Sequence, residues 1–445
     1  MKNISRCKWA LWLSILSLMN CDAFLDIQPE GSVIPKTLAD FRGLMISAYD
    51  DIYLPLSIES FLALRTDDIK PHTSAQTFPS YRDIYSWRDA TPSPDTKAFP
   101  YEGFYNVIFY VNHIINEGGK TIAAASEKEQ LIGEAYALRA YVYFDLINLY
   151  GKPYRAETAD TGVPLVLDVD LERNFKPQSV QQIYDRVLAD LEEAKRRLHT
   201  TVPETGSNYR FSLLALYALE ARVNLYMDRW ESALQAADHA LSLKKTLVNL
   251  NESQILPNAY TSPESILALA NTYTLRDIGY PSDGLINLYD RADDLRFPLY
   301  FKYDAESGNY RVDKGGESNA CSFRVAELYL IQSESLLHLD RLESAKKPLL
   351  VLIENRYKTE RLPDRKARIK SMNQEAFRAE LFAERRRELA FEGHRWFDLR
   401  RTTQPQITHV LSGKTYTLNP NDPRYTLPFP ESARLRNPFL THPGP

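Results

Sequence analysis

The sequence predicts a mostly α protein with tetratricopeptide-like helical repeats and long irregular insertions that form a binding face. Three observations support this fold class: apolar residues recur at helical spacing through most of the chain, one six-residue motif occurs twice, and two long polar segments interrupt the helical pattern. We expect a single domain over residues 21–445. Its helical repeats are predicted at about 127–244 and 322–400, with irregular regions at 66–100 and 245–320.

The helical pattern is clearest in residues 127–150. Leu131 and Leu138 belong to an apolar series at spacings of three and four, and the sequence Gly151-Lys-Pro153 predicts the end of this helix. Six further segments are predicted to be helical: 179–198, 211–228, 230–243, 323–339, 342–356 and 374–400. The last of these is strongly charged, whereas the others show an apolar face.

The repeated motif stands at the turn between two apolar helices. It reads Asp228-Arg-Trp-Glu-Ser-Ala233 in the first copy and Asp340-Arg-Leu-Glu-Ser-Ala345 in the second. Small residues occupy most of the positions where tetratricopeptide helices touch most closely, and the six positions are Ala221, Ala233, Ala240, Ser333, Ala345 and Leu352. Two repeats are too few for a free solenoid, which needs about three, so the other helices are expected to complete the core.

The tail, residues 402–445, is rich in proline. Its prolines are at positions 405, 420, 423, 428, 430, 438, 443 and 445. Proline has no backbone N–H to donate and cannot continue a helix or a central strand. We therefore expect the tail to lie along the helical body as irregular chain.

Residues 1–20 are predicted to be a lipoprotein signal peptide. Lys2, Arg6 and Lys8 precede an apolar run of 11 residues, which is too short for a spanning helix because the hydrocarbon layer needs about 20. Cys21 follows this run and is the expected lipidation site, although Asn20 stands where a small residue is usual. A plain secreted protein or an uncleaved precursor are the alternatives.

Cysteine content and charge exclude several classes of protein. Cys7 leaves with the signal and Cys21 takes lipid, so Cys321 alone remains and no disulfide framework can form. Loss of the three signal cations takes the formal net charge from −4 to −7. Without a polybasic run, nucleic acid is not an expected partner.

The motif search finds no catalytic or metal site, and no cofactor is expected. The cluster Glu384, Glu388, Glu392, Arg395 and Asp398 could suggest glycoside hydrolysis, but neighbouring arginines would remove the protonated acid, so we interpret it as i,i+3 and i,i+4 ion pairs. The chain lacks a P-loop, an H-E-x-x-H motif, a C-x-x-C motif and a G-x-S-x-G motif. A surface glycoside hydrolase remains an alternative function.

Several stretches taken together suggest a family. They are Cys21–Pro29, Glu134–Leu146, Arg186–Ala194, Phe323–Leu330, Glu388–Arg400 and Tyr425–Pro430. On these residues the chain resembles the SusD/RagB family of outer-membrane lipoproteins from Bacteroidetes, with Tyr357 where a second arginine is more usual. The resemblance implies a non-enzymatic protein, lipid-anchored in the outer membrane and facing the cell surface. It would bind an oligo- or polysaccharide, or a peptide, and deliver it to a SusC-like TonB-dependent outer-membrane transporter.

Trp87 is the strongest candidate for ligand binding, because it lies in the irregular region 66–100 near several polar side chains. A flat aromatic ring can stack on a sugar while carboxylate and guanidinium groups bind hydroxyls. The candidate ligand-binding residues are Trp87, Asp67, Asp68, Arg82, Tyr85 and Tyr289. Weaker candidates are Tyr273, Tyr280, Tyr300 and Tyr303. The alternative role for Trp87 is to staple the long loop to the body of the protein.

Overall fold

A computed structural model describes residues 35–53, 58–156, 159–169, 173–204, 206–270, 278–314 and 320–440. The predicted signal peptide, Cys21 and Tyr273 lie outside these residues. Among the residues described, no helix is both long and apolar enough to cross a membrane.

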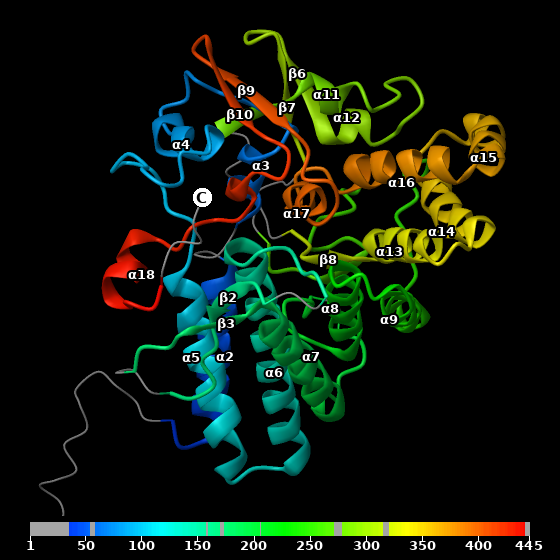
Figure 1. Ribbon diagram of the computed structural model, residues 1–445. Helices are drawn as coiled ribbons and strands as arrows, with labels where there is room; N and C mark the ends of the chain where they lie inside the picture. The colour runs from blue at the N-terminus through cyan, green and yellow to red at the C-terminus, as the bar shows by residue number, and fades with distance from the viewer. Residues whose placement is uncertain are drawn as a thin grey trace, which may run out of the picture.

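Helices make up most of the described chain, which confirms the predicted fold class. The long helices are α2 (Leu38–Tyr53), α5 (Glu102–Glu117), α6 (Ala125–Tyr150), α7 (Val180–Arg197), α8 (Leu213–Tyr226), α9 (Trp230–Leu243), α13 (Val325–His338), α14 (Leu342–Glu354), α15 (Leu362–Ser371), α16 (Gln374–Glu388) and α17 (His394–Arg401). Consecutive helices pack in pairs, α6 on α7, α8 on α9 and α13 on α14, and α9 also packs on α13 (Figure 1). This is the stacking that tetratricopeptide-like repeats produce.

The repeated motif forms the same turn twice. Asp228 and Asp340 both have a φ of 56°, in the left-handed region. The next residue in each copy donates its N–H to a carbonyl five residues earlier, Arg229 to Asn224 and Arg341 to Leu336, both at 2.9 Å. The six close-contact positions are fully buried, and the Ser333 hydroxyl donates to the carbonyl of Ala345 at 2.8 Å.

The prediction of one helix over 374–400 is wrong. Helix α16 ends at Glu388, and α17 begins only at His394. Between them Phe391 and Gly393 have φ values of 63° and 82°, so the chain turns away from the axis of α16.

The irregular half gathers at one side of the helices, at the top of Figure 1. It contains α3 (Glu59–Leu64), α4 (Arg82–Tyr85), α11 (Asp283–Ile286), α12 (Phe297–Tyr300) and two antiparallel hairpins, β6–β7 (Phe301–Asp304 and Asn309–Val312) and β9–β10 (Ile407–Leu411 and Lys414–Leu418). Strand β1 (Ile69–Pro71) pairs with β5 (Gly279–Pro281) and joins the two irregular regions. These elements share a hydrophobic core of their own.

The tail is more regular than its proline content predicts. Hairpin β9–β10 fits between Pro405 and Pro420, so neither proline interrupts a strand. Its turn contains Ser412 and Gly413, both with positive φ, as a tight hairpin requires. Beyond the hairpin the tail forms a short helix, α18 (Glu431–Arg436).

Candidate functional site

Trp87 is enclosed in the structure. Its side chain is 2% exposed, its indole N–H donates to the carbonyl of Arg65 at 3.3 Å, and its ring stacks on His409 with 4.1 Å between ring centroids. Tyr85 stacks on the other face of the His409 ring with 4.0 Å between ring centroids, and Tyr85 is itself buried. Neither Trp87 nor Tyr85 is therefore accessible to a ligand in this structure. The three rings fasten the loop to strand β9, which is the alternative role for Trp87.

Asp67 and Asp68 lie side by side and are held by arginines of the C-terminal helices. Arg395 donates to both carboxylate oxygens of Asp67, at 2.8 and 2.9 Å, and Arg386 donates to Asp68 at 2.7 Å. Burial alone would raise the pKa of Asp67, but its bonds to Arg395 outweigh burial, so the pKa lies below the usual value. The Asp67 side chain is still 36% exposed. Arg82 is half-exposed and donates to the Ser93 hydroxyl at 3.3 Å.

Tyr289 is also unavailable to a ligand. Its ring is buried in the core of the irregular half, and its hydroxyl donates to the carbonyl of Arg387 at 2.6 Å. Tyr280 and Tyr300 are buried as well. Tyr303 is different, because its side chain is 62% exposed.

Tyr303 and Tyr310 face each other across hairpin β6–β7, and we call them the hairpin aromatic pair. Their ring centroids are 5.4 Å apart and their planes make an angle of 65°. Tyr310 is half-buried and fixed in place. Its ring packs edge-on against the ring of Phe297, with 5.2 Å between ring centroids, and the Arg291 guanidinium lies 5.6 Å from the Phe297 ring and 5.6 Å from the Tyr310 ring. The pair thus presents one free ring next to one fixed ring.

A hydrogen-bonded ion pair lies on the opposite face of the same hairpin, because Asp304 and Arg311 follow Tyr303 and Tyr310 along the strands and successive side chains alternate. Arg311 donates to one carboxylate oxygen of Asp304 at 2.6 and 2.9 Å, and the Ser307 hydroxyl donates to the same atom at 2.7 Å. The Ser307 bond is the main reason why the pKa of Asp304 is lowered, so this carboxylate remains an acceptor at neutral pH. On the face of the aromatic pair, the Arg291 guanidinium lies near the Tyr310 ring, so this face can bind a sugar by stacking and by bonds to hydroxyls.

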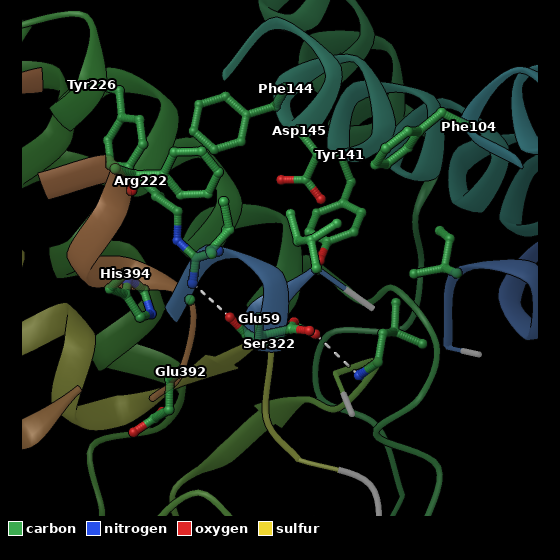
Figure 2. Close-up of a pocket in the computed structure, with 16 residues that line it drawn as sticks. Glu59, Phe104, Tyr141, Phe144, Asp145, Arg222, Tyr226, Ser322, Glu392 and His394 are labelled. Carbon is green, nitrogen blue, oxygen red and sulfur yellow. Dashed lines mark hydrogen bonds between the residues drawn. The ribbon is translucent and has the colours of Figure 1, made fainter. Parts of the chain in front are cut away.

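A small cavity lies between the helical half and the irregular half. Its volume is about 50 Å³, and its lining includes Asp145 from α6, Arg222 from α8, Glu59 from α3 and His394 from α17. Figure 2 shows Asp145 above Glu59 across this space, with Arg222 and His394 beside them. A volume this small can hold a few waters, whereas ligand pockets have several hundred Å³. It is an internal cavity of the core.

Asp145 is a buried carboxyl group of the cavity with a raised pKa. Burial raises its pKa to about 7, and Glu59 adds to this effect, whereas Arg222 opposes it. Arg222 itself is held by both carboxylate oxygens of Glu327, at 2.7 and 2.6 Å, and by the carbonyl of Ser322 at 2.5 Å. Asp145 was not among the candidates predicted from the sequence, although an acid within the otherwise apolar run Ala140–Ile147 is a sequence signal for a buried carboxyl group.

No metal centre is apparent in the part of the chain that the structure covers: no group of three or more acidic, histidine or cysteine side chains there is placed to hold an ion.

Two protein-family models match most of the chain. The model of the SusD family matches residues 271–441, and a SusD-like model described as starch-binding associating with outer membrane matches residues 23–225. The chain belongs to the SusD family. The description of the second model associates its members with the outer membrane.

Individual relatives agree with this membership. SusD-like protein P38 of Formosa agariphila is 30% identical over 263 residues, which cover 57% of this chain and 48% of that protein, so the match spans about half of P38. SusD-like protein P25 of the same species is 23% identical over 96% of both chains. A SusD superfamily protein from Bacteroides thetaiotaomicron shares the fold with a TM-score of 0.79 and 21% identity, covering 92% of this chain and 100% of that chain. A laminarin-binding SusD-like protein shares it with a TM-score of 0.68 and 18% identity, over 92% and 100% of the chains.

In this SusD-family chain, the family stretch 388–400 begins in a buried ion-pair network. Glu388 accepts hydrogen bonds from Arg296 at 2.8 Å, Arg324 at 2.6 Å and Arg356 at 2.9 Å, and all four side chains are fully buried. Burial alone would raise the pKa of Glu388, but the three guanidinium groups hold it well below its usual range. Glu388 therefore cannot act as a protonated acid.

The predicted pairing within one helix is wrong for Glu388, Glu392 and Arg395, whereas Glu384 with Arg387 and Asp398 with Arg401 do form i,i+3 pairs. Glu392 pairs with Arg324 and with Lys314, whose Nζ lies 2.5 Å from Glu392 Oε1, and Arg395 pairs with Asp67. Because the chain leaves the helix after Glu388, these side chains point to other segments and not along one helical face. The cluster is an ion-pair network, but it joins elements far apart in the sequence.

Proposed function

We propose that this SusD-family protein binds an oligo- or polysaccharide on its irregular face and delivers it to a SusC-like TonB-dependent transporter. The observation that carries the proposal is the hairpin aromatic pair, where the exposed Tyr303 stands beside the fixed Tyr310. The family model described as starch-binding and the laminarin-binding structural relative support a saccharide as the ligand class.

The contacts expected at this site follow from the side chains present. A sugar ring would lay its C–H face on Tyr303 and its edge against Tyr310, because aromatic rings offer an apolar face at low entropic cost. The Arg291 guanidinium, 5.6 Å from the Tyr310 ring, would donate to the hydroxyls. Of the residues first considered, Asp67 and Arg82 remain exposed enough to contribute at the margin of the same face.

The test is a pair of tyrosine variants. Tyr303→Ala should weaken glycan binding by roughly tenfold to a hundredfold, since a base stacked on an aromatic side chain contributes about 1–3 kcal/mol and a sugar should gain a comparable amount. Tyr209→Ala is the matched control, because Tyr209 is 44% exposed and lies before α8, away from the hairpin. Affinity would be measured by isothermal titration calorimetry. Equal affinities for the two variants would contradict the assignment of Tyr303.

Attachment to the outer membrane is proposed to use lipid on Cys21. The short apolar run that ends at Met19 supports a signal peptide, and the family description supports the membrane. Cys21→Ala should leave the protein soluble or retained as a precursor. Membrane partitioning and labelled fatty-acid uptake unchanged in Cys21→Ala would rule out this anchor.

An enzymatic function is the second candidate, because Asp145 has the raised pKa of a catalytic acid. The cavity around it is far smaller than a sugar-binding pocket, which favours binding without catalysis. Incubation of the protein with a glycan panel should release no new reducing ends. Release that is lost in Asp145→Asn would replace the binding proposal with a hydrolase.

A further inference from the structure

A groove of about 500 Å³ lies on another part of the molecule, between the connection from β2 (Thr161–Pro164) to β3 (Pro177–Ser179) and the C-terminal tail. This volume falls within the range of roughly 300–1,000 Å³ that small-molecule sites occupy. Figure 1 places β2, β3 and α18 in the left half of the molecule, whereas β6 and β7 are above them at the top. The groove is therefore separate from the hairpin aromatic pair.

Two phenylalanine rings form the apolar part of the groove, together with Leu165 and Leu167. The Arg173 guanidinium lies 4.7 Å from the ring of Phe175, and the Lys176 ammonium lies 4.8 Å from the ring of Phe439. Phe439 is 40% exposed, although the next residue, Leu440, is buried and anchors the backbone. The Phe439 ring is thus presented to solvent by a fixed segment of chain.

Buried hydrogen bonds hold one wall of the groove. Asn112, fully buried in α5, donates its amide to the carbonyls of Val166 at 3.0 Å and Asp168 at 3.3 Å. The Tyr143 hydroxyl, from α6, donates to the Val166 carbonyl at 2.9 Å and accepts from its N–H at 2.7 Å. Both helices therefore fix the backbone of this wall from behind.

The support extends further into the core. Arg139 donates to the amide oxygen of Asn112 at 2.7 Å, and it is paired with Asp190 through two bonds of 2.7 and 2.8 Å. On the other side, the Asn437 amide donates to the carbonyl of Phe175 at 2.9 Å and ties the tail to the loop. A site whose walls are fixed before the ligand arrives loses less entropy on binding.

We propose that this groove is a second saccharide site, which binds a segment of neutral oligosaccharide. The proposal rests on the proposed function, because it takes the same class of ligand. The rings and leucines offer an apolar face, the amides of Asn174 and Gln178 can both donate and accept, and Asp168 with Arg173 supplies one acceptor group and one donor group.

Charge favours a neutral sugar over an acidic one. Asp168 and Arg173 lie 3.6 Å apart and largely neutralise each other. Among the charged residues that line the groove in the described part of the chain, Lys176 adds a single positive charge to this neutralised pair. A ligand with repeated carboxylates or sulfates would therefore meet one cation here, with the Asp168 carboxylate close by.

The experiment is calorimetry and native mass spectrometry on the mature protein with maltoheptaose and with laminarihexaose. We expect two sugars bound per chain. Phe439→Ala should weaken one site by about tenfold or more, by analogy with aromatic stacking on nucleobases, and leave the other unchanged. Tyr303→Ala should weaken binding at the hairpin aromatic pair and leave binding in the groove unchanged. Leu435→Ala is the matched control, because Leu435 is 81% exposed in α18 and does not line the groove.

Each alternative outcome has a definite meaning. A single site that Tyr303→Ala removes and Phe439→Ala leaves intact would overturn the groove and retain the proposed function. A single site removed by Phe439→Ala alone would support the groove and overturn the placement at Tyr303. If neither sugar binds, both the groove site and the proposed function are contradicted. If polygalacturonate binds in a way that depends on Phe439 and the neutral sugars do not bind, the assignment of a neutral ligand to the groove is overturned. Unchanged thermal midpoints of the variants would show that folding is intact.

Discussion

The backbone of Trp87 has a φ of 51°, in a region that side chains other than glycine adopt at a cost. The surrounding contacts hold it there: the bond to Arg65, the stack on His409 and the enclosure of the ring. Such a residue contributes to stability more than to recognition.

Trp87→Ala is therefore expected to lower the free energy of unfolding by about 3–5 kcal/mol, as for other large aromatic truncations in cores. Its effect on glycan affinity should be small compared with that of Tyr303→Ala. Denaturant unfolding and calorimetry of the same samples provide the measurement. A large loss of affinity with unchanged stability would restore Trp87 as the stacking platform.

Asp145 predicts a pH dependence of stability. Its pKa is about 7 in the folded protein and about 3.8 for an ordinary aspartate, so between these values the folded state holds a proton that the unfolded state has lost. The stabilising contribution of this proton is complete below pH 4, falls as pH rises and is lost above about pH 7. Asp145→Asn removes the dependence.

Relative to the wild type, Asp145→Asn should be more stable at pH 8 than at pH 5. The free energy of unfolding of the wild type should fall by about 1.4 kcal/mol for each pH unit between pH 5 and pH 7, and that of Asp145→Asn should not show this fall. Thermal unfolding across pH 4–9 would measure it. Parallel pH curves for the two proteins would show that Asp145 titrates normally.

At the residue scale, the sequence shows which side chains share region 66–100 but not which of them stay exposed. It predicts that Trp87, Asp67 and Tyr85 lie together with polar neighbours in this region. What removes Trp87 and Tyr85 from the surface is His409, and what binds Asp67 is Arg395, both more than 300 residues further along the chain. The composition of a local segment does not reveal partners so far away in the sequence. The sequence places Tyr303 in an irregular region, but only the packing of the folded chain shows that its side chain is exposed.

The helical elements were largely predictable, because periodicity and stop signals are local. Helix α9 has the predicted bounds, 230–243, and α6 and α7 begin and end within two residues of their expected positions. The break after Glu388 was not predictable from periodicity, since polar and apolar residues continue at helical spacing through 400. Tertiary ion pairs override the local pattern there.

The repeat turn offers a test of backbone strain at the scale of an element. Asp228 is exposed and has a φ of 56°, so its replacement tests conformation with little change in packing. Asp228→Val should destabilise the protein by about 1–2 kcal/mol, because a β-branched residue resists the left-handed region, whereas Asp228→Gly should be neutral or slightly stabilising. Chemical denaturation would compare them. At the second turn, Asp340→Gly also loses a bond from Gln374, so any gain should be smaller.

Across the whole molecule, the network around Glu388 joins four segments. Arg296 precedes α12, Arg324 closes β8 (Phe323–Arg324), Arg356 follows α14 and Glu388 ends α16. A buried carboxylate with three guanidinium partners contributes most when it is intact, because removal of its charge leaves Arg296, Arg324 and Arg356 with fewer carboxylates to balance them.

Glu388→Gln is expected to destabilise the protein by about 3–5 kcal/mol. Glu231→Gln is the control, since Glu231 pairs with Arg341, both side chains are exposed, and an exposed pair contributes about 0–1 kcal/mol. Thermal and denaturant unfolding of both variants would measure the difference. A small effect of Glu388→Gln would mean that water replaces the lost charge in the core.

The fastening of region 58–100 by the tail has a consequence for how the protein reaches its final state. Arg65 donates to the carbonyl of Arg424, Trp87 stacks on His409, and Asp67 is held by Arg395. During synthesis, which proceeds from the N-terminus, these early residues appear long before their partners. Contacts of such long sequence separation form slowly, and the exposed aromatic side chains favour aggregation in the interval. We therefore expect the last fifty residues to complete folding, so that chains truncated before residue 395 aggregate or are degraded.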